Sequence, residues 1–354
     1  MIALHDPQAG RSNELTPDNV RLIRLPRSEA WPDRLGCARE HLRRLSPDWI
    51  SWQIVATSFH PRGFLPGSLL QQAPELRGPR CHLMLHELWL GLETGTGWRN
   101  RAIGWLQRRG IVCLLNRLDA ESIQTSNPTY QRALGQAGFE AGILELFGNV
   151  PVAAALPAGA RPLNRWLPPA TGRPVPAPFV AVTFGTLHRQ WEPAATIEWL
   201  GTTARRLGRP PLLLCLGRAG SRAPAILAAF RRGGIPAAET GGLDATTLSH
   251  LLRAADFGLA PHPWALIGKS GAAAAMLDHG LPVLVPRDEW RLRGGAGPGT
   301  ADGDPLLVRL AGLDAAATDR WLARRHEPRP ALPRITDAFL QTLAEPLRPA
   351  ESSR

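Results

Sequence analysis

The chain is almost devoid of lysine. Lys269 is the single lysine among 41 basic residues, and all the others are arginine. Tyrosine occurs once, whereas Arg, Ala, Gly and Pro are abundant, which is the residue usage of a GC-rich genome. Because such usage replaces lysine by arginine, the one lysine that remains marks a position to follow.

Several other features are missing. No apolar stretch approaches the roughly 18 residues of a membrane-spanning helix, and the opening MIALHDPQAG lacks the basic and apolar regions of a secretory signal. The four cysteines lie far apart without a CxxC pair, which argues against a zinc cluster or a disulfide framework. No HExxH motif occurs either. We therefore expect a cytoplasmic protein without a metal site.

The net charge of +11 favours anionic partners. The arginines form scattered doublets on amphipathic patterns, not a run, and solvated helix faces are their simplest interpretation. The doublets are Arg43-Arg44, Arg108-Arg109, Arg205-Arg206, Arg231-Arg232 and Arg324-Arg325. Aromatic residues do not interleave with them, which argues against nucleic acid. Two kinds of anionic partner therefore remain: a phosphorylated substrate, and the anionic inner face of a membrane that the protein contacts peripherally.

Short apolar runs bounded by Gly, Pro, Asn or Asp predict strands, and helical patterns lie between them. In the first half the strands are expected at 2–5, 20–25, 49–55, 82–88, 121–126 and 143–147, and the helices at 33–45, 98–118 and 129–137. In the second half the strands are expected at 179–185, 211–217, 235–239, 257–261 and 281–286. The helices there are expected at 193–207, 222–232, 244–254, 270–279, 313–325 and 335–346.

Residues 151–178 contain eight prolines and almost no periodicity. We predict an α/β fold of two doubly wound parallel-sheet domains, 1–160 and 179–330, joined by a Pro-rich linker at 161–178. A C-terminal helix and tail follow at 331–354. Ligands bind such sheets at the carboxyl ends of the strands, so the cleft between the two domains is the expected site.

Lys269 stands where a strand and a loop lead into a small-residue helix, in PHPWALIGKSGAAAAMLDHG. Backbone N–H groups and the positive end of the helix dipole suit an anion there. Lys269 adds a charge and Ser270 a hydroxyl, while Gly268 and Gly271 allow close approach. The structural alternative is that Ser270 only caps the helix. A P-loop is disfavoured, because Pro263 stands where that motif requires glycine.

The segment LSHLLRAADFGLAPHPWALIGKSGAAAAMLDHGLPVLV (248–285) resembles the donor-site segment of GT-B glycosyltransferases of the large family-four type. In that family a helix ending in Ala-Ala-Asp leads to a strand, a loop, a Gly-containing helix start and a strand beginning GLPV. Further matches follow in the expected order, at MLHELW (84–89), TSNPTY (125–130), LFGNVPV (146–152) and VTFGTLHRQW (182–191). Together they cover roughly residues 45–290.

The resemblance implies two Rossmann-like domains facing a cleft. It also implies transfer of a sugar from a nucleotide diphosphate donor to a glycan or lipid-linked acceptor, as in polysaccharide biosynthesis. No metal or other cofactor is expected. Negative charge grows on the leaving diphosphate, and donors placed in advance stabilise it. Lys269, Ser270 and the helix start stand where this is needed.

The resemblance also suggests partners for the phosphates on neighbouring strand ends. Gly185 and Thr186 follow the first strand of the second domain, where glycine lets backbone amides approach a pyrophosphate. Arg218 ends the next strand, and its fork suits phosphate oxygens, although a surface position explains it equally well. His188 and Arg189 follow Thr186, and for them the surface interpretation is favoured.

In the first domain His86 ends a strand. By resemblance it contacts the donor sugar or moves a proton to the acceptor, although a lone histidine is more often structural. Glu87 and His60 are further acceptor-side candidates, with Glu87 alternatively holding a neighbouring residue. This domain begins with the run IALH and a loop containing only Gly10, where the family has a Gly-rich acceptor loop.

One departure concerns the donor site. The family places two Glu around the donor-site helix, and this chain has Ile267 and Ala275 at those positions. Asp278, one turn further on, is a possible substitute. These departures keep two alternatives open: a non-catalytic GT-B descendant that binds a nucleotide or glycan, and another GT-B enzyme such as an epimerase or phosphorylase.

Overall fold

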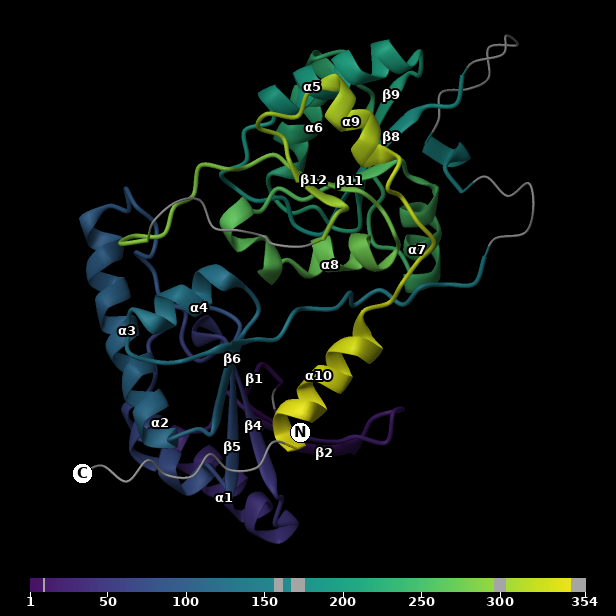
Figure 1. Ribbon diagram of the computed structural model, residues 1–354. Coiled ribbons are helices and arrows are strands. Elements are labelled where there is room, and N and C mark those ends of the chain that lie inside the picture. Colours follow the sequence, from purple (N-terminus) through teal and green to yellow (C-terminus); the bar gives the residue numbers. More distant parts are fainter. Residues whose placement is uncertain (9, 156–161, 167–175, 296–303, 345–354) are drawn as a thin grey trace. The chain divides into compact units, whose positions relative to one another are not determined.

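The computed structural model describes residues 1–8, 10–155, 162–166, 176–295 and 304–344 (Figure 1). These residues form two compact units, which are described separately. The first comprises Met1–Leu144, Leu292–Gly295 and the described residues from Phe339 onward. The second comprises Glu145–Arg291 and the described residues from 304 to 338. Most of the predicted linker lies outside the described residues.

The first unit contains two sheets. The larger is parallel, in the order β4 (Trp49–Ile54), β5 (Arg80–Leu85), β6 (Ser122–Thr125) and β7 (Gly142–Ile143). In the smaller, β1 (Ile2–Asp6) pairs in parallel with β3 (Arg21–Pro26), and β2 (Ser12–Leu15) pairs antiparallel with β3. The sequence does not predict β2, because its four residues include a single apolar side chain. The strand expected at 143–147 is reduced to β7.

The helices of the first unit are α1 (Trp31–Leu45), α2 (Gly67–Gln72), α3 (Trp98–Leu118) and α4 (Pro128–Gly135), with 3-10 turns at Ala56–Ser58 and Ala73–Leu76. The last turns of α10 (Leu332–Ala344) belong to it as well. The side chain of Asn127 accepts a hydrogen bond from the N–H of Tyr130, and Pro128 occupies the first helical position of α4. The helix predicted at 129–137 is therefore present, and it begins one residue earlier, at Pro128.

The second unit contains one six-stranded sheet, and all its neighbouring strands are parallel. Its order is β10 (Ala237–Glu239), β9 (Pro211–Leu216), β8 (Phe179–Phe184), β11 (Phe257–Leu259), β12 (Val283–Val285) and β13 (Leu307–Arg309). The helices are α5 (Ala194–Leu207), α6 (Ala223–Arg232), α7 (Ala245–Ala254), α8 (Gly271–Asp278) and α9 (Ala315–Leu322). Two 3-10 helices are Asn164–Trp166 and Trp264–Lys269.

Helices cover both faces of this sheet, with α5, α6 and α9 on one side and α7 and α8 on the other (Figure 1). Successive side chains of a strand point to opposite faces. Phe179 therefore packs with Phe230 and Trp321 in one core, while Val180 packs with Met276 in the other. Burying each large apolar side chain contributes about 1.5–3 kcal/mol. Within the described residues, no helix combines the length and apolarity needed to cross a membrane.

Candidate functional site

The strand order of the six-stranded sheet creates a place for a ligand. The chain runs outward from β8 through β9 to β10 and then crosses back to β11, on the other side of β8. The loops that leave the carboxyl ends of β8 and β11 therefore diverge, and doubly wound sheets bind ligands at this point. The candidates of the second unit lie on these loops and on the loop after β12.

The loop after β8 is held by its neighbour. Gly185, at a φ of 75°, donates its N–H to the carbonyl oxygen of Leu216 at 3.2 Å. A β-carbon at Gly220 would lie 2.8 Å from Cγ2 of Thr186, so the Thr186 side chain lies against the loop after β9. Gly185 and Thr186 thus shape this turn, and the chain leaves it at His188.

Two histidines and an arginine meet beyond these strand ends. Arg287 follows β12, is 5% exposed, and donates from Nη1 to Nδ1 of His188 at 2.6 Å. The ring of His262, which follows β11, lies edge-on to that of His188, with centroids 5.9 Å apart. Glu289 accepts from Nε of Arg287 at 2.7 Å. Because the guanidinium only donates, Nδ1 of His188 accepts, and a neutral His188 carries its proton on Nε2.

The surroundings keep both imidazoles neutral. Burial lowers the pKa of His188 to about 4, and the nearby cations act in the same direction. These cations are Arg287, Lys269 and Arg189. Burial also lowers the pKa of His262 to about 4, with His188 and the neighbouring cations as smaller causes. Three cations and the carboxylate of Glu289 act on His188 in this partly buried site, and the excess of positive charge suits an anion.

One atom of this cluster lacks a partner. Nδ1 of His262 is buried, and none of the described residues forms a hydrogen bond with it. Leaving a buried polar atom unsatisfied costs about 1–3 kcal/mol. A bound ligand with an oxygen or a hydroxyl at this position would remove that cost.

The segment after β11 places Lys269 beside the histidines. The 3-10 helix Trp264–Lys269 lies within the predicted loop, and α8 begins at Gly271. Oγ of Ser270, which is 3% exposed, accepts from the N–H of Ala273 at 3.2 Å. Ser270 is therefore a helix cap, while its hydroxyl proton can still be donated.

Two predicted residues contribute no side chain to the cluster. Gly268 is exposed at the end of the 3-10 helix. Arg218 is exposed after β9, and its guanidinium forms no ion pair within the described ranges. This position agrees with the surface alternative for Arg218.

The residues aligned with the family's Glu pair belong to the core. Ile267 is 4% exposed and Ala275 is fully buried, both in the core formed with α7 and α8. The carboxylate of Asp278 accepts from the N–H groups of Gly148 at 2.9 Å and Ala331 at 3.2 Å. Asp278 thus anchors two backbone segments and does not replace a sugar-binding Glu.

In the first unit, His86 begins a chain of hydrogen bonds. Its Nε2 donates to Oε1 of Gln53 at 2.7 Å, and Nε2 of Gln53 donates to Oγ of Ser51 at 2.9 Å. The Ser51 hydroxyl donates to Nδ1 of His82 at 2.8 Å, and Nε2 of His82 donates to Oε1 of Gln124 at 3.0 Å. Every donor points away from His86, so Nδ1 of His86 carries the lone pair.

This arrangement suits a proton acceptor. Burial lowers the pKa of His86, with the charge of Glu87 opposing it, so the imidazole is neutral near pH 7. Oε2 of Glu87 accepts a hydrogen bond from the Thr57 hydroxyl at 3.3 Å, so Glu87 holds a neighbouring residue, which was the alternative to an acceptor-side role. His60 is exposed, and its Nδ1 accepts from the N–H of Arg62 at 3.0 Å, within its own turn.

The described residues contain no group of three or more His, Cys, Asp or Glu arranged to hold a metal ion. The sequence contains one Asp-x-Asp triplet, at 302–304. Its first two residues lie outside the described ranges, and Oδ1 of Asp304 accepts from the N–H of Leu306 at 2.9 Å.

No family model matches the sequence, and no curated protein is significantly similar to it. Solved structures are similar in fold. Sucrose-phosphate synthase from Thermosynechococcus elongatus is 15% identical, with 96% of this chain and 80% of that chain covered and a TM-score of 0.55. HepE from Anabaena, in complex with UDP and glucose, is 14% identical, with 91% and 85% covered and a TM-score of 0.52. The fold class is therefore GT-B, with two α/β units built on parallel sheets.

Proposed function

We propose that this protein is a glycosyltransferase that takes a sugar from a nucleotide diphosphate donor, and that it resembles the family-four type of GT-B enzyme. The observation that carries the proposal is the cluster of Lys269, Arg287, His188 and His262 at the crossover point of the six-stranded sheet. It joins fixed positive charge to buried nitrogen atoms, which is the chemistry that a diphosphate requires.

In this proposal the leaving diphosphate is stabilised by the protein's own cations, without a metal ion. Lys269 is a flexible point charge, and Arg287 is held by Glu289 and His188 so that its guanidinium needs no rearrangement. As the bond to the sugar breaks, negative charge grows on the phosphate oxygens. Placing these cations in advance lowers the barrier, because they need not reorganise during the reaction.

His86 is proposed to act at the sugar end, as the group that receives a proton from the acceptor hydroxyl. Its neutral state supports this role, as does its Nδ1, which accepts no hydrogen bond from the part of the chain that the structure describes. The acceptor is proposed to be a glycan or a lipid-linked sugar. The UDP and glucose bound by HepE support a nucleotide sugar as the donor.

A thermal-shift panel of nucleoside diphosphates, followed by donor hydrolysis and transfer assays, tests the proposal. We expect one diphosphate to raise Tm, its nucleoside to raise it less, and the corresponding nucleotide sugar to be turned over. If no diphosphate binds, both the proposed site and the proposed function are wrong.

A second candidate is a nucleotide-binding GT-B descendant without turnover. The buried Ile267 and Ala275 favour it, because no carboxylate from these positions can hold the donor sugar. Stabilisation by a diphosphate without hydrolysis, transfer or epimerisation of any nucleotide sugar would support this candidate over the enzyme.

A further inference from the structure

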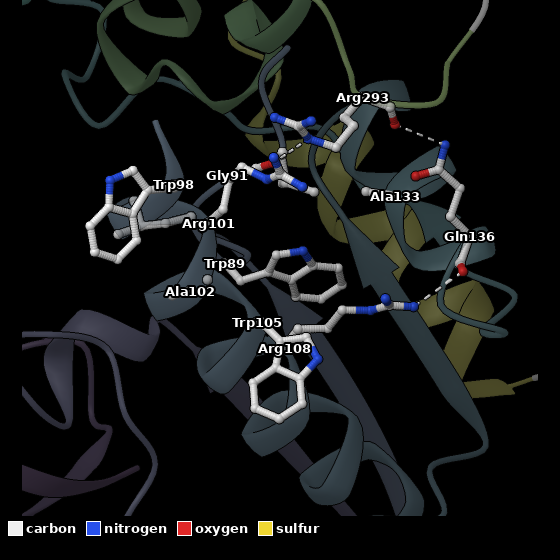
Figure 2. Close-up of a pocket in the computed structure, with 13 residues that line it drawn as sticks. Trp89, Gly91, Trp98, Arg101, Ala102, Trp105, Arg108, Ala133, Gln136 and Arg293 are labelled. Atoms are coloured by element: carbon white, nitrogen blue, oxygen red, sulfur yellow. Dashed lines mark hydrogen bonds between the residues drawn. The ribbon is translucent and has the colours of Figure 1, made fainter. Parts of the chain in front are cut away.

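A second site lies wholly within the first unit. A pocket of about 670 Å³ opens between the first half of α3 and the loop that follows β5 (Figure 2). The lining residues are Trp89, Leu90, Gly91, Leu92, Trp98, Arg101, Ala102, Gly104, Trp105, Arg108, Ala133, Gln136 and Arg293. None of them belongs to the proposed donor site.

The pocket is held open by specific contacts. A β-carbon at Gly104 would lie 1.8 Å from the carbonyl oxygen of Leu90, so only glycine lets this loop pack on α3. The buried Gln107 accepts from the N–H of Leu90 at 2.7 Å. Arg293 donates to the carbonyl oxygens of Gly91 at 3.2 Å and Glu93 at 3.1 Å. These contacts fix the loop, and the pocket walls are therefore set before any ligand arrives.

The pocket carries positive charge without a counter-charge. Its lining includes three arginines and no carboxylate. Figure 2 shows Arg101, Arg108 and Arg293 around the indole of Trp89. Residues 94–118 contain five arginines and no acidic residue, and the first turn of α3 has neither an acidic residue nor a side-chain cap. Within the described ranges, the Arg101 guanidinium has no ion pair or hydrogen bond.

The rim of the pocket is apolar and faces solvent. Trp98 is 73% exposed and Trp105 is 55% exposed, and Leu90 and Leu106 beside them are about half exposed. Exposed large apolar side chains normally mark a contact surface when they gather in one place. Tryptophan next to arginine is the composition of a surface that lies in the headgroup region of a bilayer.

We propose that this face, formed by α3 residues 98–109 and the loop at 89–92, docks on an anionic lipid membrane. The arginines of the pocket bind lipid phosphate, while Trp98, Trp105 and Leu106 enter the headgroup region. A soluble anion would satisfy the arginines and leave the tryptophans in water, whereas a bilayer supplies both partners. The proposal goes beyond the reaction, and it holds whether or not the second unit binds a nucleotide.

Cosedimentation with vesicles tests it. The lipids are phosphatidylglycerol mixed with phosphatidylcholine, and vesicles of phosphatidylcholine alone serve as the control. One variant reverses charge in the face, Arg101→Glu with Arg109→Glu, and another removes its apolar rim, Trp98→Ser with Trp105→Ser. The matched control is Arg43→Glu with Arg44→Glu, an exposed pair on α1 with the same change in net charge. Tm and nucleotide binding are measured for each variant.

We expect the wild type to bind the anionic vesicles at low salt, and to bind at least about tenfold more weakly at 0.5 M salt. Each of the two face variants should bind the anionic vesicles about tenfold or more weakly than the wild type, and the affinity of the control pair should fall far less. Brominated lipid should quench tryptophan fluorescence in the wild type and less in the tryptophan variant.

Three results would each overturn the proposal. The first is that the wild type does not bind anionic vesicles. The second is that the control pair loses as much vesicle affinity as the face variants. The third is that inorganic phosphate releases the protein from vesicles at constant ionic strength while the tryptophan variant binds as tightly as the wild type. The last result would indicate a site for a soluble anion. Because nucleotide binding is measured on the same variants, failure of this proposal is distinguishable from failure of the proposed function.

Discussion

Replacing Lys269 by alanine should weaken the binding of a nucleoside diphosphate far more than that of its nucleoside. Lys269 ends a 3-10 helix, and its charge helps to lower the pKa of both His188 and His262. Losing one charge-assisted contact costs about 1.5–3 kcal/mol, which corresponds to roughly a 10- to 150-fold increase in Kd. The nucleoside makes no phosphate contact, so its Kd should change by less than about twofold.

Calorimetric titration at constant salt measures both dissociation constants. Arg232→Ala, an exposed charge at the end of α6, is the matched control for the loss of one positive charge. A second readout is the pKa of His188 and His262, which should rise in Lys269→Ala because one repelling cation is gone. Equal weakening of diphosphate and nucleoside, or equal effects of the two variants, would refute the assignment of Lys269 to the phosphates.

Three further outcomes follow from the site. His86→Ala should lower kcat and kcat/KM together and leave diphosphate affinity within about twofold; intact turnover or an unfolded protein would return the search for an acceptor-side residue to His60. Gln53→Glu should raise the pKa of His86, because a carboxylate favours the imidazolium, and should move the acidic limb of the pH–rate profile upward; an unmoved profile would contradict the role of Gln53 in positioning His86. His188→Gln with His262→Gln should flatten the loss of stability on acidification. Both pKa values lie near 4 in the folded protein and near 6.5 when unfolded, so the unfolded chain binds more protons and stability falls as pH drops from about 6.5 to 4; identical Tm profiles in wild type and variant would refute this.

Long periodic segments were predictable from the sequence, and short irregular ones were not. The helix at 98–118 has the predicted bounds, because its 21 residues give a clear helical pattern between Gly97 and Asp119. Strands β8 to β12 of the second unit also lie within the ranges that the apolar runs predict, since both faces of the sheet are buried there. The sequence does not predict β13, which is only three residues long and is partly exposed. The strand predicted at 143–147 is mostly absent, because only its first residue, Ile143, pairs with β6.

In the candidate site too, residues with a local sequence pattern could be predicted, and residues that are brought together only by the fold could not. Lys269 was found because a helix start with glycines and a hydroxyl has a local chemical pattern. Arg287 and His262 were missed, since only the strand order brings the loops after β11 and β12 to His188. The surface interpretation of His188 did not foresee its hydrogen bond from Arg287, because that partner lies 99 positions away in the chain.

The pocket on the first unit had a readable signal as well. In the stretch WRNRAIGWLQRR two tryptophans alternate with four arginines, so the expectation that aromatic residues do not interleave with the arginine doublets is wrong at Arg108-Arg109. The interpretation as a solvated helix face overlooked this pattern. What the pattern alone does not reveal is Gly104, whose missing side chain lets the loop at 89–92 pack against α3 and form the concave wall.

The most direct test of the central claim is to follow the imidazole NMR signals of His188 and His262 during titration with a nucleoside diphosphate. His→Gln variants at the two positions assign the signals. If the diphosphate binds beside Lys269 and Arg287, both signals shift on binding and both pKa values rise, because a bound phosphate favours the imidazolium. The nucleoside should leave both pKa values near 4. Diphosphate binding that leaves these two signals unchanged would place the phosphates elsewhere and contradict the account.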